Sequence, residues 1–211
     1  MRRLPVYLLL DSSGSMKGEP AESVKVGLQA MISYLRQDPF ALESVWLSVI
    51  SFDRDVKVLV PLTPIDTFQV PEIVTPDSGP THLGAALEVL CSQIRSEIIK
   101  TSNDIKGDWK PLLFIMTDGS PSDVKRFRDT IPEIKKIGFG SIIACAAGAN
   151  AKEEILRELA DQVVSLDTTD AATFSQYFKW VSASVSMGNK SMGTNSTVLL
   201  PPPPPEVHVV Y

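Results

Sequence analysis

Two strand-like apolar runs, each followed directly by an aspartate, constrain most strongly what this chain can fold into. The first run is Pro5 to Leu10 and precedes Asp11, and the second is Pro111 to Thr117 and precedes Asp118. A continuous apolar run predicts a strand in a sheet that is covered on both faces. Parallel strands end at the same edge of a sheet, where ligands bind in α/β folds. If these two strands are neighbours, we expect the two carboxylates to face one another.

The rest of the chain alternates between strand-like and helix-like segments. Further strands are expected at 45–52, 56–60, 140–147 and 163–166, and helices at about 21–36, 83–100, 122–136, 152–160 and 170–184. A short polar turn joins 45–52 to 56–60, which predicts an antiparallel pair with 56–60 at the sheet edge. The helix over 122–136 contains Pro132 and is expected to be kinked or broken there. The pattern predicts an α/β fold: a doubly wound, mostly parallel sheet with one antiparallel edge strand and helices on both faces.

The C-terminal end differs in composition from the rest of the chain. We expect a domain over residues 1–186, followed at 187–211 by a linker, a polyproline segment and a tail. Residues 187–197 are rich in Gly, Ser and Asn, which predicts a flexible linker, and Pro201 to Pro205 should form a stiff polyproline II rod. The strand-like residues 206–211 are either a disordered tail or an arm that docks on a partner or on the chain's own sheet edge.

Composition excludes several classes of function. The net charge is -5, so no basic field attracts nucleic acid or an acidic membrane. No stretch is long enough to span a bilayer, and the first apolar run is too short and lacks the cleavage site of a secretory signal. We therefore expect a cytoplasmic protein. Cys91 and Cys145 each lie among apolar residues, which predicts buried, reduced thiols and not zinc ligands.

The loop after the first strand carries oxygen atoms at alternate positions. Asp11, Ser13 and Ser15 form the pattern Asp-x-Ser-x-Ser, and Gly14 gives the turn its backbone freedom. Three hard oxygen donors on one short loop suit a small divalent cation. A serine-rich turn that caps the following helix explains the loop equally well when the loop is taken alone.

Two later segments favour the metal interpretation. Thr81 precedes the expected helix at 83–100 and can be a helix cap or a ligand, and Asp118 can be part of an Asp-Gly turn or a ligand. Three oxygen-bearing segments, two at strand ends and one at a helix start, together predict a metal site. Its ligands are Asp11, Ser13, Ser15, Thr81 and Asp118. Two carboxylates with three neutral hydroxyls favour Mg²⁺, with Mn²⁺ and Ca²⁺ as alternatives. We expect the ion to keep an open position for a carboxylate from a partner protein.

These motifs resemble the metal-ion-dependent adhesion site of von Willebrand factor type A domains, and the resemblance covers about residues 5–185. It implies that the two serines and Thr81 bind the ion directly, and that Asp11 and Asp118 bind it directly or through water. Four stretches are similar to the bacterial TerY-like branch linked to tellurium resistance: 3–11, 18–20, 108–112 and 117–123. That resemblance implies a scaffold in a stress response, with a protein kinase and a PP2C-type phosphatase as partners.

Enzyme interpretations fit the sequence less well. A phosphoester hydrolase of the haloacid-dehalogenase type needs a second aspartate two residues after its nucleophile, where this chain has Ser13. A P-loop needs Gly-Lys-Ser/Thr, which the stretch Gly14 to Gly18 lacks. A serine hydrolase needs Gly-x-Ser-x-Gly, which does not surround Ser15. We predict a binding module with no catalytic residues, and keep the haloacid-dehalogenase-type hydrolase as the alternative.

Overall fold

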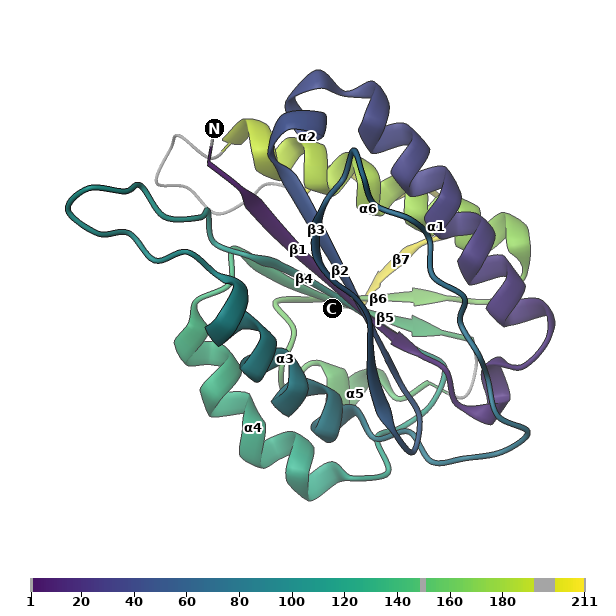
Figure 1. Cartoon of the computed structure of the whole chain (residues 1–211). Helices are drawn as coiled ribbons and strands as arrows, with labels where there is room; N and C mark the ends of the chain where they lie inside the picture. Colours follow the sequence, from purple (N-terminus) through teal and green to yellow (C-terminus); the bar gives the residue numbers. More distant parts are fainter. Residues whose placement is uncertain (1, 149–150, 192–199, 211) are drawn as a thin grey trace.

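A computed structural model describes residues 2–148, 151–191 and 200–210. These residues form a seven-stranded sheet in the order β3-β2-β1-β4-β5-β6-β7 (Figure 1). The strands are β1 (Leu4–Asp11), β2 (Val45–Phe52), β3 (Val56–Pro64), β4 (Leu112–Thr117), β5 (Ser141–Ala147), β6 (Gln162–Leu166) and β7 (His208–Val210). The helices are α1 (Glu19–Gln37), α2 (Pro39–Ser44), α3 (Leu83–Glu97), α4 (Val124–Ile137), α5 (Glu153–Leu156) and α6 (Ala171–Ser191), with a short 3₁₀ turn, η1 (Gly14–Met16). The expected α/β fold with a mostly parallel sheet is confirmed.

The first strand lies at the centre of the sheet and is buried along its whole length. It pairs in parallel with β2 on one side and with β4 on the other. β2 pairs in turn with β3 in antiparallel orientation, so the predicted edge strand is confirmed. Because β1 and β4 are direct neighbours, Asp11 and Thr117 end their strands at the same edge of the sheet.

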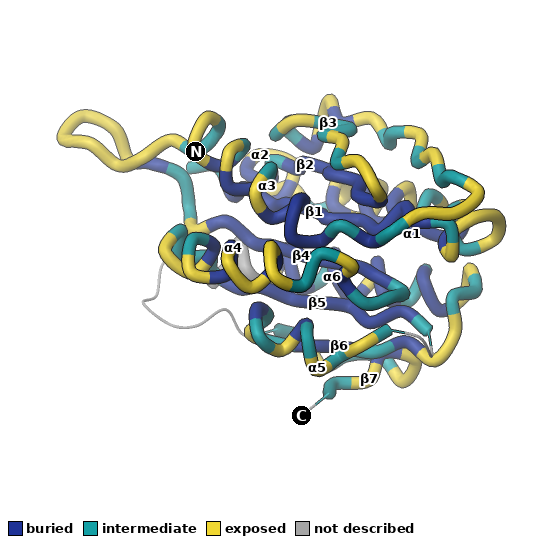
Figure 2. The backbone as a smooth tube through the Cα atoms, turned by 90° about the horizontal axis from the view of Figure 1, so that it is seen from below, coloured by how far each residue is buried: buried dark blue, intermediate teal, exposed yellow. Residues whose placement is uncertain are grey.

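Helices cover both faces of this sheet (Figure 1). α1, α2 and α6 share one apolar core with Leu8 and Leu10, whereas α3, α4 and α5 share a second core with Tyr7 and Leu9. One strand supplies both cores because successive side chains of a strand point to opposite faces. Figure 2 shows the inner strands buried, the edge strands β3 and β7 less so, and the outer turns of the helices exposed. Both cysteines are buried free thiols, as predicted.

The helix α4 runs through Pro132 without interruption, so a break there is excluded, while the predicted kink stays a prediction. Proline removes one backbone hydrogen bond from a helix interior. The buried side chains of Phe127, Ile131 and Ile134 lie on both sides of the proline and pack into one core. This packing holds the two halves of α4 together as one helix.

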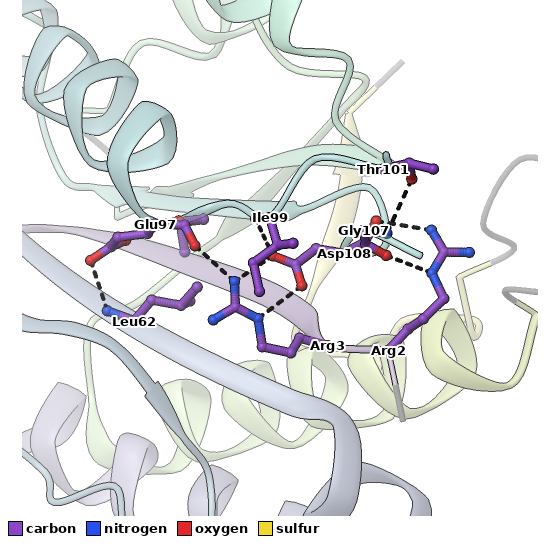
Figure 3. A network of polar contacts seen from close by, with 9 residues as sticks. Arg2, Arg3, Leu62, Glu97, Ile99, Thr101, Gly107 and Asp108 are labelled. Atoms are coloured by element: carbon purple, nitrogen blue, oxygen red, sulfur yellow. Dashed lines mark hydrogen bonds and ion pairs between the residues drawn. The ribbon is translucent and has the colours of Figure 1, made fainter. Parts of the chain in front are cut away.

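A long exposed loop between α3 and β4 extends away from the sheet (Figures 1 and 2). Its base is held by Asp108, whose carboxylate accepts hydrogen bonds from Arg3 Nε at 2.8 Å and Arg3 Nη2 at 2.6 Å (Figure 3). The same carboxylate accepts the N–H of Ile99 at 2.8 Å. That bond turns the chain away from the helical path, so α3 ends at Glu97 and not near residue 100 as predicted.

The last helix extends into the segment predicted to be a flexible linker. α6 ends at Ser191, so residues 187–191 are helical. The remainder of the predicted linker lies outside the described residues, and the division of the chain at residue 186 stays a prediction. None of the described helices combines the length and apolar character that a membrane span requires.

The C-terminal residues form an additional strand on the chain's own sheet. β7 pairs in antiparallel orientation with β6, which makes a second antiparallel edge beside the predicted one. Val207 is 2% exposed and packs in the core on the α6 side. The indole N–H of Trp180 donates to the carbonyl of Pro201 at 2.9 Å. Of the two interpretations of the tail, docking on its own sheet edge is the one observed.

Deleting residues 200–211 should lower the free energy of unfolding by about 2 kcal/mol, because the burial of Val207 and the β7 valines is lost while chain entropy is regained. Val207→Asp should cost the same amount, since the edge strand β7 can undock from β6 and so avoid keeping a charge in the core. Urea denaturation measures both changes, with the exposed neighbour Glu206→Ala as the control. A cost for Val207→Asp well above that of the deletion would show that the tail cannot undock separately.

Candidate metal centre

The carboxyl ends of β1 and β4 bring two predicted site residues into one cluster. Leu10 is paired in register with Met116, so Asp11 lies beside Thr117. The hydroxyl of Thr117 donates to Asp11 Oδ2 at 2.6 Å and accepts the N–H of Gly119 at 3.3 Å. Thr117 therefore ties Asp11 to the turn that carries Asp118. The sheet register, and not the loops, places the two carboxylates at this edge.

The loop after β1 folds its two serines toward Asp118. The N–H of Ser13 donates to Asp11 Oδ1 at 2.8 Å, and the N–H of Met16 donates to the carbonyl of Ser13 at 2.9 Å, which forms η1. Ser13 Oγ lies 3.1 Å from Ser15 Oγ, and Ser15 Oγ donates to Asp118 Oδ1 at 2.8 Å. The oxygens of Ser13, Ser15 and Asp118 thus form a continuous chain across the end of the sheet.

Thr81 reaches the same place from the start of α3. Its N–H donates to Ser122 Oγ at 3.0 Å, and its carbonyl accepts the N–H of Ser122 at 2.8 Å. A Cβ built on Gly119 would lie 3.6 Å from Thr81 Oγ1, so the Thr81 hydroxyl lies beside the turn that follows Asp118. The structure therefore brings all five predicted site residues to one edge of the sheet.

The interpretation of Thr81 as a helix cap is wrong. The carboxylate of Asp123 accepts the N–H of Gly84 at 3.0 Å and the N–H of Ala85 at 2.9 Å, which are free donors of the first turn of α3. The cap thus comes from a residue far along the chain. Because Asp123 satisfies the helix, the Thr81 hydroxyl is available for another role.

Burial makes this cluster unfavourable for negative charge. Asp11 is 2% exposed, and its burial raises the pKa of this carboxyl even though Thr117 and Ser13 donate hydrogen bonds to it. Burial also raises the pKa of Asp118, against the effect of its bond from Ser15. A cation placed among these oxygens would compensate the two carboxylates. The described residues contain no metal-binding group of three or more His, Cys, Asp or Glu side chains, so a metal site here needs other oxygen donors, and the nearby hydroxyls can supply them.

A segment of the proline-rich connection crosses directly over the loop at Gly14. A Cβ added to Gly14 would lie 2.6 Å from the Cα of Ser78, a distance that no side chain tolerates. Lys17 forms an ion pair with Asp77 beside this crossing. Glycine is required here by the close approach of the two backbones. The crossing holds the loop against the segment that leads to Thr81.

Sequence reasoning missed three residues that support the cluster: Thr117, Asp123 and Asp53. The sequence pattern places Thr117 in a strand and Asp123 at the start of a helix, and neither position by itself indicates a role in the cluster. Asp53 directly follows β2, as Asp11 ends β1 and Asp118 follows β4. This repeated occurrence of aspartate at strand ends was the available signal for Asp53.

Several solved structures share this fold. Proximal thread matrix protein 1 from the mussel byssus is 17% identical over 88% of this chain and 47% of that chain, with a TM-score of 0.63. A second structure of that protein, described as having a zinc-occupied MIDAS motif, is 16% identical over 88% of this chain and 48% of its own, with a TM-score of 0.62. A von Willebrand factor type A structure from Catenulispora acidiphila is 16% identical over 88% and 43%, with a TM-score of 0.66.

At these identities the similarity shows the fold, and this chain spans less than half the length of those structures. None of the curated proteins compared with the chain is similar enough to count as a match. The family model of the von Willebrand factor type A domain matches residues 6–179 of this chain. That range includes every residue of the cluster. The chain belongs to the von Willebrand factor type A domain family.

Proposed function

We propose that this domain binds a divalent ion through Asp11, Ser13, Ser15, Thr81 and Asp118, and binds a carboxylate of a partner protein through that ion. The chain of oxygens from Ser13 through Ser15 to Asp118 carries the proposal. A buried carboxylate, Asp11, and a half-buried one, Asp118, beside three hydroxyls suit a hard divalent cation. When bound, the ion supplies an electrophilic position for an oxygen from outside the chain. The protein's own residues hold that position at the exposed end of the sheet.

The donor set favours Mg²⁺, with Mn²⁺ and Ca²⁺ as alternatives. All five side chains offer oxygen, which suits these ions, whereas structural zinc sites are built mainly from Cys and His. The mussel structure described with a zinc-occupied MIDAS motif supports a divalent ion in a site of this kind. The titration described below therefore includes Zn²⁺ with the three expected ions.

A role in binding is favoured over catalysis. Domains of this family are generally interaction modules. The alternative, a phosphoester hydrolase of the haloacid-dehalogenase type, needs a carboxylate where Ser13 stands, and the Ser13 hydroxyl lies against Ser15 instead. No observation favours that hydrolase.

On the sequence resemblance alone, we propose a cytoplasmic role in a bacterial tellurite or stress response. That resemblance rests on stretches such as Thr117 to Asp123. A protein kinase and a PP2C-type phosphatase are then the partners to test first. Each would have to present an acidic side chain to the ion.

Two measurements on the full chain test the proposed function. Calorimetric titration with Mg²⁺, Mn²⁺, Ca²⁺ and Zn²⁺ should show one bound ion per chain. Capture of partners from native lysate on the immobilised chain should succeed with Mg²⁺ present and fail after chelation. Capture of the same proteins in chelator would rule out binding through an ion.

A further inference from the structure

The turn after β2 contains a third aspartate at a strand end, Asp53, which has no role in the proposed ligand set. This residue is 8% exposed. Asp11 is paired in register with Phe52, so Asp53 lies beside the residue that follows Asp11. The neighbouring strands β2, β1 and β4 therefore lead to Asp53, Asp11 and Asp118 at one edge of the sheet.

Asp53 holds the proposed metal loop through Ser12, which lies between two proposed ligands. Ser12 is 1% exposed, and its Oγ donates to Asp53 Oδ2 at 3.0 Å. The N–H of Ser12 donates to the carbonyl of Phe52 at 2.9 Å. On the opposite side, Asp11 accepts the hydroxyl of Thr117 at 2.6 Å. The loop is thus held to β2 through Ser12 and to β4 through Asp11.

The same turn holds the segment that carries Thr81. The N–H of His82 donates to the carbonyl of Asp53 at 3.0 Å, and His82 Nδ1 lies 2.9 Å from the carbonyl of Arg54. Asp53 Oδ1 accepts the N–H of Asp55 at 2.9 Å, which closes the turn and orients both carbonyls. The turn therefore connects two of the three segments that form the metal site.

We propose that Asp53 is a positioning residue, which sets the placement of the loop from Asp11 to Ser15 relative to Thr81 without binding the ion. Both of its carboxylate oxygens accept hydrogen bonds from the chain itself, one from Ser12 and one from the N–H of Asp55. This inference rests on the proposed metal-binding function. Residues that orient metal ligands through hydrogen bonds typically contribute 10- to 100-fold to affinity.

The affinity of the full chain for Mn²⁺, measured by calorimetric titration, tests this role. Asp53→Ala and Ser12→Ala should each weaken binding about 10-fold or more. The double variant should bind no more weakly than the weaker single variant, because both changes remove the same link. The Mn²⁺ affinity of Asp53→Asn should stay within about threefold of the wild-type affinity. The asparagine carbonyl can accept the N–H of Asp55, while the asparagine amide donates to the Ser12 hydroxyl.

Asp55→Ala is the matched control, because Asp55 is exposed and bonds to Asp53 through its backbone alone. Thermal unfolding without metal identifies any variant that has lost the fold, and Ser12→Ala and Asp53→Asn keep the test decisive if Asp53→Ala does not fold. If Asp53→Ala and Asp53→Asn weaken Mn²⁺ binding equally, the positioning role is overturned, because the negative charge of Asp53 would then be the cause of the effect. Unchanged binding by Asp53→Ala or by Ser12→Ala overturns it too. A wild-type chain that binds no ion overturns the proposed function itself, and Asp53's role with it.

Discussion

Replacing both serines of the loop, Ser13→Ala with Ser15→Ala, should weaken Mn²⁺ binding at least about 100-fold, since even indirect ligand supports are worth 10- to 100-fold. The change removes two of the three proposed hydroxyl ligands and the hydrogen bond from Ser15 to Asp118. The backbone bonds that shape the loop, from Met16 to Ser13 and from Ser13 to Asp11, do not use the hydroxyls. We therefore expect the loop to keep its fold while it loses the ion.

Calorimetry measures this loss, and capture of a partner should disappear with it. The double variant Ser92→Ala with Ser102→Ala is the control, because both serines are exposed and far in sequence from the metal loop. It should bind Mn²⁺ like the wild type. Unchanged affinity in the loop variant would contradict the ligand assignment. Retained partner capture by a variant that has lost the ion would separate partner binding from the metal.

Asp108→Ala should lower the free energy of unfolding by about 3 kcal/mol, the lower end of the usual cost of breaking a buried ion pair, because this pair is only partly buried. The side chain of Asp108 is 3% exposed and that of Arg3 is 19% exposed, so the carboxylate is shielded from water and the guanidinium is partly shielded. The Asp108 carboxylate raises the pKa of Arg3 above its ordinary value, so the guanidinium stays charged. In the Asp108→Ala variant, the Arg3 guanidinium would keep its hydrogen bond to the carbonyl of Glu97 and its contact over the ring of Trp46, and would lose both bonds to Asp108.

Urea denaturation checks this cost, and Asp104→Ala is the matched control because Asp104 is an exposed aspartate in the same loop. The control should change stability by less than about 0.5 kcal/mol. The pair lies at the N-terminal end of β1, whereas the metal cluster lies at its carboxyl end. Metal affinity of folded Asp108→Ala should therefore equal that of the wild type. A cost below about 1 kcal/mol would show that solvent reaches the pair, as in exposed ion pairs.

Much of the fold follows from local patterns in the sequence. The apolar run of β1 is buried along its length because its side chains alternate between two cores, and a continuous run is the pattern that this arrangement produces. The short polar turn after β2 likewise predicts the antiparallel strand β3. Patterns of this kind do not report on packing between distant segments, so they leave open whether α4 continues through Pro132 or breaks there.

The site residues can be predicted from the sequence because their types and spacing are local properties. Asp11, Ser13 and Ser15 lie on one loop, and Asp118 repeats the position of Asp11 after a second strand. Whether Thr81 is a cap or lies free beside this loop depends on Asp123, which reaches the start of α3 from the start of another helix. No pattern near Thr81 contains that information.

By itself, the sequence determined the order of strands and helices apart from α2, the antiparallel edge at β3 and the loop that bears the proposed ligands, because each depends on residues that are close along the chain. The tertiary structure decided that β1 and β4 are neighbours and that Asp53 links Ser12 to the segment of Thr81. It also decided that the tail adds an edge strand beside β6. These features join residues far apart in sequence. They arise only when burial of the two cores selects one register and one packing.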